Sequence, residues 1–562
     1  MLKDYFEVPN KPAIKSGNVL SCDFTDHETF IPQPLDFTRN TLATYVDCNG
    51  VIKVSGVSDT ELVTNGDFAT DRNWSKFGGA TISGGKGNII GDGSSFTNLT
   101  QANVFVVGKT YEITVDVTIN SGLGLKFQDG ITNENFGHAT VSGVYTFYGV
   151  ANNTSFVIGR RTGGTPFNSF VNNVSVKEVD LNVPRIDYLT EIGKAKELQK
   201  PSLLLEPQST NKFTRSKNFS SNYWSKSNCT VQQSTITSPD GSQSSYKLIP
   251  DAGTGGNRSL GRNFTSLSNL HTFSVFAKKD ELRYLFLRLR NAPNEMAVFD
   301  LEDGVISATS PSPTQLVADS AKIEDYGNGW FRCSATFDPS QSNTVGQLYP
   351  SFSADNTGAL TSSFDGDGTS GIYIFGAQLE EKNYVTSYIP TSGSTVTRNV
   401  ELCDNAGKRG VFNKAEGTIY VEFTELGFTN PNQSSIAVSQ EGSSNNRLLL
   451  FRGGGSNWSF QVRAAAVNEV SNSVNLTTTE TLNKFAKVAI RYKSGEVTAF
   501  VNGSQSFTNS STFAFNSNLF KFGFTPWDGA TNNNFYGRVK DVKVFRRTLT
   551  DSEMAELTNN IT

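Results

Sequence analysis

Two tryptophans of this chain stand among polar and glycine residues whose chemistry suits the recognition of a sugar. The residues concerned are Trp458, which follows a run of glycines, and the group Trp527, Asp528, Asn532, Asn533 and Asn534. A sugar ring stacks on a flat apolar surface and needs a few oriented polar groups beside it. We therefore predict ligand-binding loops at these two places. The alternative is that these aromatic side chains belong to an interface between subunits.

Residue types that carry catalysis are sparse in the sequence. The three histidines are widely separated, and the motifs G-x-S-x-G, H-E-x-x-H and the P-loop do not occur. A glycosidase needs two carboxylates about 5 to 10 Å apart. Pairs such as Glu422 with Glu425, or Asp365 with Asp367, arise by coincidence among 53 acidic residues. We expect no catalytic residues, and we predict that the protein is not an enzyme.

The composition excludes several other classes of protein. A net charge of −4 gives no general reason to bind nucleic acid, and no run of apolar residues is long enough to cross a membrane. The five cysteines are far apart and form no C-x-x-C pair, which excludes a disulfide framework and a zinc site. The N-terminus lacks the pattern of a signal peptide. We expect free thiols in a protein made in a reducing cytosol.

The elements that would position these residues include a pattern that the chain contains twice. Residues 61–80 and 214–230 each have an Asn and a Phe followed by Trp-Ser-Lys. In both copies a middle strand follows (110–117 and 271–278), and then an apolar closing strand (169–179 and 371–381). Repetition on this scale predicts two copies of one β-module. Trp74 and Trp224 hold matching positions, and we interpret them as core residues rather than ligand platforms.

Glycine-rich turns and many short strand patterns predict an all-β chain of tandem antiparallel β-sandwich (jelly-roll) domains with an extended N-terminal arm. The predicted parts are the arm (1–36), a small β unit split between 37–60 and 181–210, jelly-roll modules at 61–180 and 211–391, a linker at 392–411, and a third sandwich at 412–562.

Two local motifs refine this organisation. Asn49 and Gly50 stand between two strand-like runs and predict a β-hairpin, because both residue types accept a positive φ. Near the C-terminus, Thr550 and Glu553 have the spacing of a capping box that begins a short helix. Met554 and Leu557 would hold that helix on the third sandwich.

Several pieces of the chain resemble known families. Residues 37–52, 182–210 and 211–398 resemble segments of tailed-bacteriophage virion proteins, through pieces such as FTRNTLATYVDCNGVIK, NFSSNYWSKSN and IEDYGNGWFRCSATF. Residues 61–180 resemble a carbohydrate-binding module of the family 4/9 type, and residues 412–562 resemble a concanavalin or laminin-G-type sandwich. Because the first module separates two segments that are usually adjacent in the phage proteins, we infer that residues 61–180 are an insertion.

The resemblance implies a virion appendage protein, such as a fibre, spike or decoration, that is made in the bacterial cytoplasm and displayed on the particle. It implies that the arm contacts other virion proteins, that the sandwiches bind host-surface or environmental glycans weakly and multivalently, and that the chain forms a homo-oligomer such as a trimer. The alternatives are a polysaccharide depolymerase and a purely structural virion protein.

No cofactor is expected to be required. The carbohydrate-binding-module resemblance implies a structural calcium near Asp67 and near Asn172 or Asn173 of the closing strand. Calcium needs several oxygen ligands at once, and amides in place of carboxylates supply less charge.

Overall fold

The computed structural model confirms an almost entirely antiparallel β protein. Of the 562 residues it describes 18–23, 36–130, 136–161, 164–253, 258–264, 267, 269–289, 295–311, 313–339, 347–352, 365–406, 412–427, 434–440, 443–452, 457–482, 484–525 and 534–559. The chain divides into two compact units. One is Val54–Val183, called here the inserted unit, and the other combines the residues before and after it.

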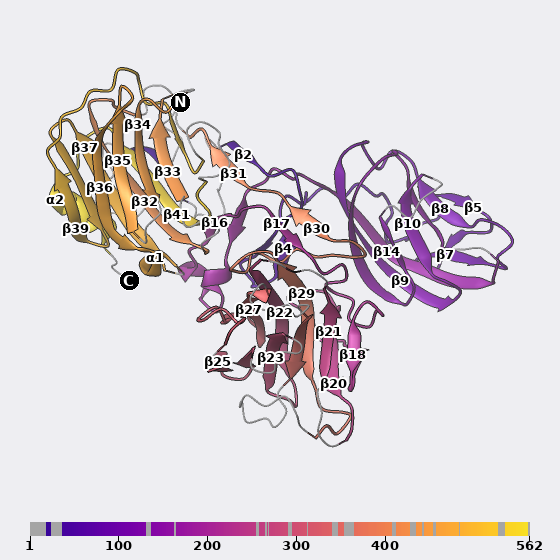
Figure 1. The fold of residues 1–562 in the computed structure, drawn as a ribbon. Helices are drawn as coiled ribbons and strands as arrows, with labels where there is room; N and C mark the ends of the chain where they lie inside the picture. Colours follow the sequence, from indigo (N-terminus) through magenta and orange to yellow (C-terminus); the bar gives the residue numbers. More distant parts are fainter. Residues whose placement is uncertain are drawn as a thin grey trace. The chain divides into compact units, whose positions relative to one another are not determined.

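The inserted unit is a sandwich of two antiparallel sheets, coloured indigo to purple in Figure 1. The first sheet has the order β12 (Gly143–Val150), β9 (Thr110–Ser121), β14 (Phe167–Val179), β7 (Lys86–Gly91) and β6 (Thr81–Ser83). The second has the order β11 (Gly137–Ala139), β10 (Leu125–Asp129), β13 (Phe156–Arg160), β8 (Asn98–Gln101) and β5 (Ser75–Phe77). Aliphatic and aromatic side chains from the inner faces of both sheets form one core.

A second sandwich, in the other unit, repeats this topology. Its first sheet has the order β26 (Lys322–Asp325), β27 (Trp330–Phe337), β22 (His271–Lys279), β29 (Ile372–Glu380), β20 (Tyr246–Pro250) and β19 (Cys229–Gln233). Its second sheet has the order β25 (Val305–Thr309), β24 (Met296–Asp300), β23 (Tyr284–Leu289), β28 (Gln347–Phe352), β21 (Ser259–Asn263) and β18 (Ser225–Ser227). Within the described residues, ten strands of the inserted unit correspond in chain order and sheet position to ten strands here. The pair β25 and β26 is additional.

The repeated tryptophans occupy equivalent positions in the two cores. Trp74 and Trp224 are 5% and 2% exposed, which confirms that they are core residues. The indole N–H of each donates to the backbone carbonyl nine residues earlier, at 3.1 Å to Asn65 and 3.0 Å to Arg215. Burial of the ring therefore leaves no polar atom of the indole unpaired.

The C-terminal sandwich contains segments from distant parts of the chain. One sheet has the order β15 (Arg185–Asp187), β16 (Ser202–Leu205), β41 (Gly537–Phe545), β32 (Glu416–Glu425), β37 (Ala486–Lys493), β38 (Glu496–Val501) and β39 (Ser504–Asn509). The other has the order β36 (Val467–Thr477), β35 (Asn457–Ala464), β34 (Arg447–Arg452), β33 (Ser434–Ser439) and β40 (Lys521–Gly523). Strands β15 and β16, from the second part of the predicted small β unit, thus pair with each other and extend this sheet.

The segments expected as an arm and a linker contain paired strands. The expected N-terminal arm contributes β1 (Asn18–Asp23), which pairs with β41; the rest of the arm before β2 lies outside the described residues. The expected linker contributes β30 (Val396–Arg398), paired with β17 (Ser209–Asn211), and β31 (Leu402–Asp404), paired with β2 (Asp36–Thr38). Cys403 of β31 and Phe37 of β2 lie in the core of the C-terminal sandwich. These segments are structural because their backbone groups are satisfied by long-range pairing.

A buried cluster of ion pairs fixes these segments. Arg185 contacts both Glu206, at 2.8 Å, and Glu401. Arg398 contacts Glu206 at 2.8 Å, and Arg39 contacts Glu401 at 3.0 Å. All five side chains are at most 2% exposed, so each charge depends on its partners for compensation.

The hairpin predicted around Asn49 and Gly50 is present as β3 (Thr44–Val46) and β4 (Ile52–Val54). Its loop is longer than a two-residue turn, and the Asp47 carboxylate accepts the backbone N–H groups of Asn49 and Val51, at 2.9 Å each. Gly50 has a positive φ of 78°, as the turn requires.

The described helices are short. They are the 3₁₀ turns η1 (Leu189–Glu191) and η2 (Lys196–Leu198), and the helices α1 (Thr478–Thr481) and α2 (Asp551–Thr558). The capping box of Thr550 and Glu553 is confirmed at the start of α2, and Met554 is buried. Within the described part of the chain, no helix has the length and hydrophobicity needed to span a membrane.

Candidate functional site

The outer face of one sheet of the inserted unit is open and polar; we call it the open face. Along β9, Ile113, Val115 and Val117 point into the core, and the alternate side chains point outward. The same alternation holds along β12 and β14, because antiparallel neighbours in register share a face. The outward side chains at the centre of the open face are Glu112, Thr114, Asp116 and Thr118 of β9, Val144, Thr146 and Tyr148 of β12, and Phe170, Asn172, Asn173, Ser175 and Lys177 of β14.

Hydrogen bonds between neighbouring strands organise this surface. The Asn172 amide nitrogen donates to the Asp116 carboxylate at 3.3 Å and to the Thr118 hydroxyl at 3.1 Å. The hydroxyls of Thr114 and Thr146 lie 3.1 Å apart. The open face therefore presents pre-positioned hydroxyl, amide and carboxylate groups that remain half-buried or exposed.

Aromatic side chains flank these polar groups. The Tyr148 hydroxyl donates to the Glu112 carboxylate at 2.5 Å, which fixes the phenol ring on β12. On the other side, Phe170 of β14 has the Lys86 ammonium 5.4 Å from its ring centroid. Rings beside oriented polar groups match the requirements of sugar recognition stated above.

A β-bulge at Asn172 shapes the centre of the open face. The register between β14 and β9 shifts between Val171 and Asn173, so both Asn172 and Asn173 approach Asp116. Such bulges redirect side chains and are frequent next to functional sites. The second sandwich has a register shift at the matching place, between β22 and β29.

In the second sandwich, the corresponding face is covered by the chain itself. Phe276 of β22 and Phe375 of β29 point away from the sandwich core and form an aromatic cluster with Tyr388. Val46 and Ile52 of the β3–β4 hairpin pack on this cluster. The second sandwich therefore has its outer face filled by its own chain, whereas the described residues of the inserted unit leave the equivalent face uncovered.

Trp458, predicted as a loop residue that binds a ligand, is buried. It is the second residue of β35 and is 0% exposed. Its ring centroid lies 4.7 Å from that of Phe423, and its indole N–H donates to Glu425 at 3.2 Å. The prediction of a ligand-binding loop is wrong here. Polar neighbours in the sequence do not reveal the direction of the ring, and the ring of Trp458 faces the core.

The second predicted loop is described only at its end. Asn534 is 1% exposed and donates to the Tyr536 hydroxyl at 3.2 Å, so its side chain does not face solvent as expected. Trp527, Asp528, Asn532 and Asn533 lie outside the described residues.

The residues suggested for calcium have separate partners. The Asp67 carboxylate accepts the backbone N–H of Ala69 at 3.2 Å, which closes its own turn. Asn172 uses its amide nitrogen for Asp116 and Thr118 on the open face, and Asn173 is exposed beside it. Across the described ranges, no group of three or more His, Cys, Asp or Glu side chains is placed to hold a metal ion. The structural calcium stays a prediction, and we derive no role for the ion.

The coincidental carboxylate pairs behave as structural groups. Glu425 is buried and contacts Arg452 at 3.0 Å, whereas Glu422, three residues earlier, accepts from the Tyr420 hydroxyl at 3.2 Å. The Asp367 carboxylate accepts hydrogen bonds from the backbone of Thr369 and Ser370, at 2.8 and 2.7 Å. The hydrogen bond from the Ser370 hydroxyl is the main reason that the pKa of Asp367 lies below its usual range.

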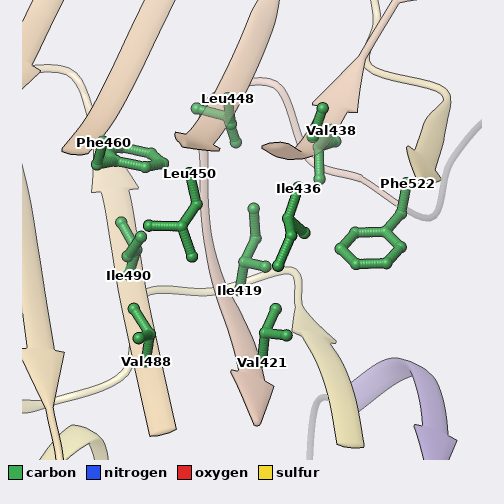
Figure 2. A pocket seen from close by; sticks show the side chains of 11 residues that line it. Ile419, Val421, Ile436, Val438, Leu448, Leu450, Phe460, Val488, Ile490 and Phe522 are labelled. Carbon is green, nitrogen blue, oxygen red and sulfur yellow. The ribbon is translucent and has the colours of Figure 1, made fainter. Parts of the chain in front are cut away.

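The cavities of the other unit are packing features. A cavity of about 20 Å³ lies between the sheets of the C-terminal sandwich. Figure 2 shows the apolar side chains that line it, which come from β32, β33, β34, β35, β37 and β40. An apolar space of this size stays dry. A second cavity, of about 50 Å³, lies beside the β3–β4 hairpin. Asp187 and Glu206 in its wall already form ion pairs, with Arg538 and Arg398 respectively.

The open face was not singled out in the sequence, although the signal is present. Residues 110–117, TYEITVDV, alternate between core residues and Glu112, Thr114 and Asp116. Alternation alone indicates only that one face of a strand is solvated. What distinguishes the open face is its contrast with the second sandwich, where long-range contacts cover the equivalent strands.

Comparison with known proteins identifies a concanavalin-like domain in the chain. Residues 417–555 match the family model Laminin_G_3, the concanavalin A-like lectin/glucanases superfamily. This range lies within the C-terminal sandwich, from β32 into α2, and agrees with the sandwich predicted there. No curated protein matches the sequence.

Solved structures similar to this chain include two carbohydrate-binding domains. The CBM40 domain of the Ruminococcus gnavus IT-sialidase, bound to α2,3-sialyllactose, has 17% identity and a TM-score of 0.23, covering 28% of this chain and 93% of that domain. Domain 4 of AbnA, an extracellular arabinanase of Geobacillus stearothermophilus, in complex with arabinotriose, has 12% identity and a TM-score of 0.23, covering 31% and 82%. The NanB sialidase of Streptococcus pneumoniae has 17% identity and a TM-score of 0.23, covering 27% and 25%.

Proposed function

We propose that the protein binds glycans and that the open face of the inserted unit carries this activity. The observation behind the proposal is the contrast between the two copies of one fold. In the second sandwich Val46 and Ile52 fill the outer face. In the inserted unit the same face presents Thr114, Asp116 and Asn172 to solvent.

The groups on the open face suit a saccharide chemically. Hydroxyls and amides exchange hydrogen bonds with sugar hydroxyls at little net cost, and each contributes about 0.5 to 1.5 kcal/mol. An aromatic ring at each side, Tyr148 and Phe170, supplies apolar surface for the C–H faces of the sugar. The match of residues 417–555 to a lectin and glucanase superfamily adds a second sandwich of a sugar-associated class.

We further propose that the protein is an appendage of a bacteriophage particle: a fibre, spike or decoration. Support comes from the ordered sequence pieces at 37–52 and 182–398 that resemble phage virion proteins. In this proposal the residues before β2 contact other virion proteins, and several copies act together as a homo-oligomer. Individually weak glycan sites then reach useful avidity because the second binding event is intramolecular.

Glycan binding is tested with the full-length protein on an array of bacterial surface polysaccharides and defined oligosaccharides. We expect binding to a subset of glycans without release of reducing ends. Release of reducing ends would support a depolymerase instead. If the protein binds none of the glycans, a purely structural role is favoured.

The virion location is tested by immunogold labelling of purified phage particles with antibodies against this protein. We expect label at regular positions on the particle surface. Infected cells that contain the protein while their purified particles carry no label would contradict the location.

A further inference from the structure

The charge of the open face allows an inference about the ligand, which rests on the glycan-binding function proposed above. The two carboxylates at its centre, Glu112 and Asp116, belong to β9, and β9 lies between β12 and β14. A third carboxylate, Glu61, accepts from the Ser175 hydroxyl at 2.6 Å, next to the same strands. None of the strands β6, β7, β9, β12 and β14 contains an arginine or a histidine.

The two lysines on the strands of the open face, Lys86 and Lys177, have neighbours of their own. Lys86 of β7 stands over the Phe170 ring. Lys177 is the cross-strand partner of Glu112 in the register of β14 and β9. The neighbours of Asp116 are Asn172, Asn173 and Val144, so a sugar bound at Asp116 meets carboxylate and amide groups before it meets a cation.

Asp116 has the most central position of these carboxylates. It faces the bulge, accepts from Asn172, and is the cross-strand partner of both Asn173 and Val144. An ionised carboxylate is an acceptor only, with about four lone-pair sites on its two oxygens. One bond from Asn172 leaves acceptor capacity that a ligand donor can use.

We propose that the open face selects neutral saccharides over saccharides that carry a carboxylate or a sulfate, and that Asp116 is the specificity-determining residue. Sugar hydroxyls donate to Asp116 in charge-assisted hydrogen bonds, which are stronger than bonds between neutral groups. An acidic sugar at the same place brings two like charges together, and such a juxtaposition suppresses the wrong ligand.

The test measures binding of the full-length protein, on one array and at low salt, to pairs of glycans that differ by an acidic group. One pair is lactose and sialyllactose. The other is a glucose-terminated and a glucuronate-terminated oligosaccharide. We expect the neutral member of a pair to bind at least tenfold more tightly. The preference should shrink as ionic strength rises, because salt screens like-charge repulsion.

The variant Asp116→Asn keeps the shape of the side chain and removes its charge. We expect it to lose most of the tenfold preference, through weaker binding of the neutral glycan and stronger binding of the acidic one. The matched control is Asp71→Asn, which changes an exposed carboxylate that contacts Lys76 of β5. The control should keep the preference of the original protein, and an unchanged thermal melt shows that each variant is folded.

Equal or tighter binding of the acidic glycans by the original protein overturns this inference and leaves the glycan-binding function standing. Retention of the preference by Asp116→Asn overturns the role of Asp116. Absence of binding to both members of every pair overturns the glycan-binding function, and the inference with it.

Discussion

Trp74 and Trp224 serve the packing of the two related sandwiches. Each ring lies beside a phenylalanine of the repeated motif, with centroid distances of 5.3 Å to Phe68 and 5.2 Å to Phe219. Each indole N–H bonds to the backbone of its own motif. The repeated sequence pattern is therefore a folding signature, which explains why it does not mark the ligand site.

Replacement of Trp74 by alanine should destabilise the inserted unit by about 3 to 5 kcal/mol, because a large buried ring is lost and a cavity remains. Hydrogen exchange of peptides from residues 54–183, measured against urea concentration, reports the stability of this unit separately. The control Phe77→Ala removes an aromatic ring that is 62% exposed and should change stability by less than about 0.5 kcal/mol. Equal stability of the two variants would contradict the core assignment.

Glu206 should make the stability of the larger unit depend on acid pH. Burial alone would raise the pKa of Glu206, but Arg398 and Arg185 outweigh burial and hold its pKa well below the usual range. Because the folded pKa lies below the unfolded value of about 4.3, the stabilisation is complete above that pH and is lost progressively as pH falls below it.

The variant Glu206→Gln tests this dependence through melting temperatures between pH 7 and pH 3. At pH 7 it removes the carboxylate partner of Arg398 and one of the two carboxylate partners of Arg185, and it should lose about 3 to 5 kcal/mol. The difference from the original protein should narrow as the pH approaches 3. The exposed control Glu197→Gln should melt like the original protein, and a difference that stays constant with pH would contradict the account.

At the scale of elements, the covered face of the second sandwich depends on the β3–β4 hairpin, which packs against it. The β3–β4 hairpin bonds to the second sandwich through Ile52, whose N–H donates to the Pro239 carbonyl at 2.8 Å. Its Thr44 hydroxyl donates to the Tyr388 carbonyl at 2.5 Å. The hairpin thus seals one face of that sandwich and makes it part of the framework.

Loss of the capping side chain in Thr550→Ala should destabilise α2 by about 1 kcal/mol, because the Glu553 N–H loses its acceptor. Hydrogen exchange of residues 551–558 measures the opening of this helix. The control Ser552→Ala changes an exposed helical residue and should be neutral or slightly stabilising. Unchanged protection in Thr550→Ala would show that the cap contributes nothing.

Sequence patterns predicted elements well where the determining contacts are local. Alternation, the Asn49-Gly50 turn and the capping box each involve neighbours in the chain, and the structure contains all three. The segment 392–411 looks like a linker in sequence, because β30 and β31 are only three residues long each. Its burial depends on partners such as Arg39, whose contact with Glu401 joins residues 362 positions apart, and local sequence does not contain that information.

The candidate site also depends on contacts that are not local in sequence. Sequence favoured Trp458, whose polar neighbours suggested a loop, but β35 places the ring in the core. The residues of the open face have ordinary strand patterns in sequence. Their common feature is that the described residues of the inserted unit leave them uncovered, and this is a property of the folded unit alone.

At the scale of the whole molecule, the inserted unit begins and ends at one place. The Ser55 hydroxyl donates to the Val183 carbonyl at 2.9 Å, and the Asp180 N–H donates to the Gly56 carbonyl at 2.9 Å. Adjacent ends allow an insertion without strain on the host fold. The inferred insertion at 61–180 therefore fits the compact unit, whose bounds extend to Val54 and Val183 because the flanking segments pair.

Deletion of residues 55–183, with Val54 joined to Pro184, should leave the larger unit folded. Calorimetry should show the loss of one unfolding transition while the others remain, and the separate fragment 54–183 should show the missing transition. The fragment 54–183 should bind glycans, and the deletion variant should lose the binding of the open face. Collapse of all transitions in the deletion variant would contradict the independence of the two units.

The central claim is that the open face of the inserted unit binds glycans. The most direct measurement compares glycan-array binding of the full-length protein with that of the double variant Thr114→Val/Asn173→Ala, which removes polar groups from the open face and leaves the core intact. The control Thr100→Val/Asn152→Ala makes the same exchanges outside the open face. We predict at least tenfold weaker binding for the open-face variant and unchanged binding for the control, whereas undiminished binding by the open-face variant would contradict the account.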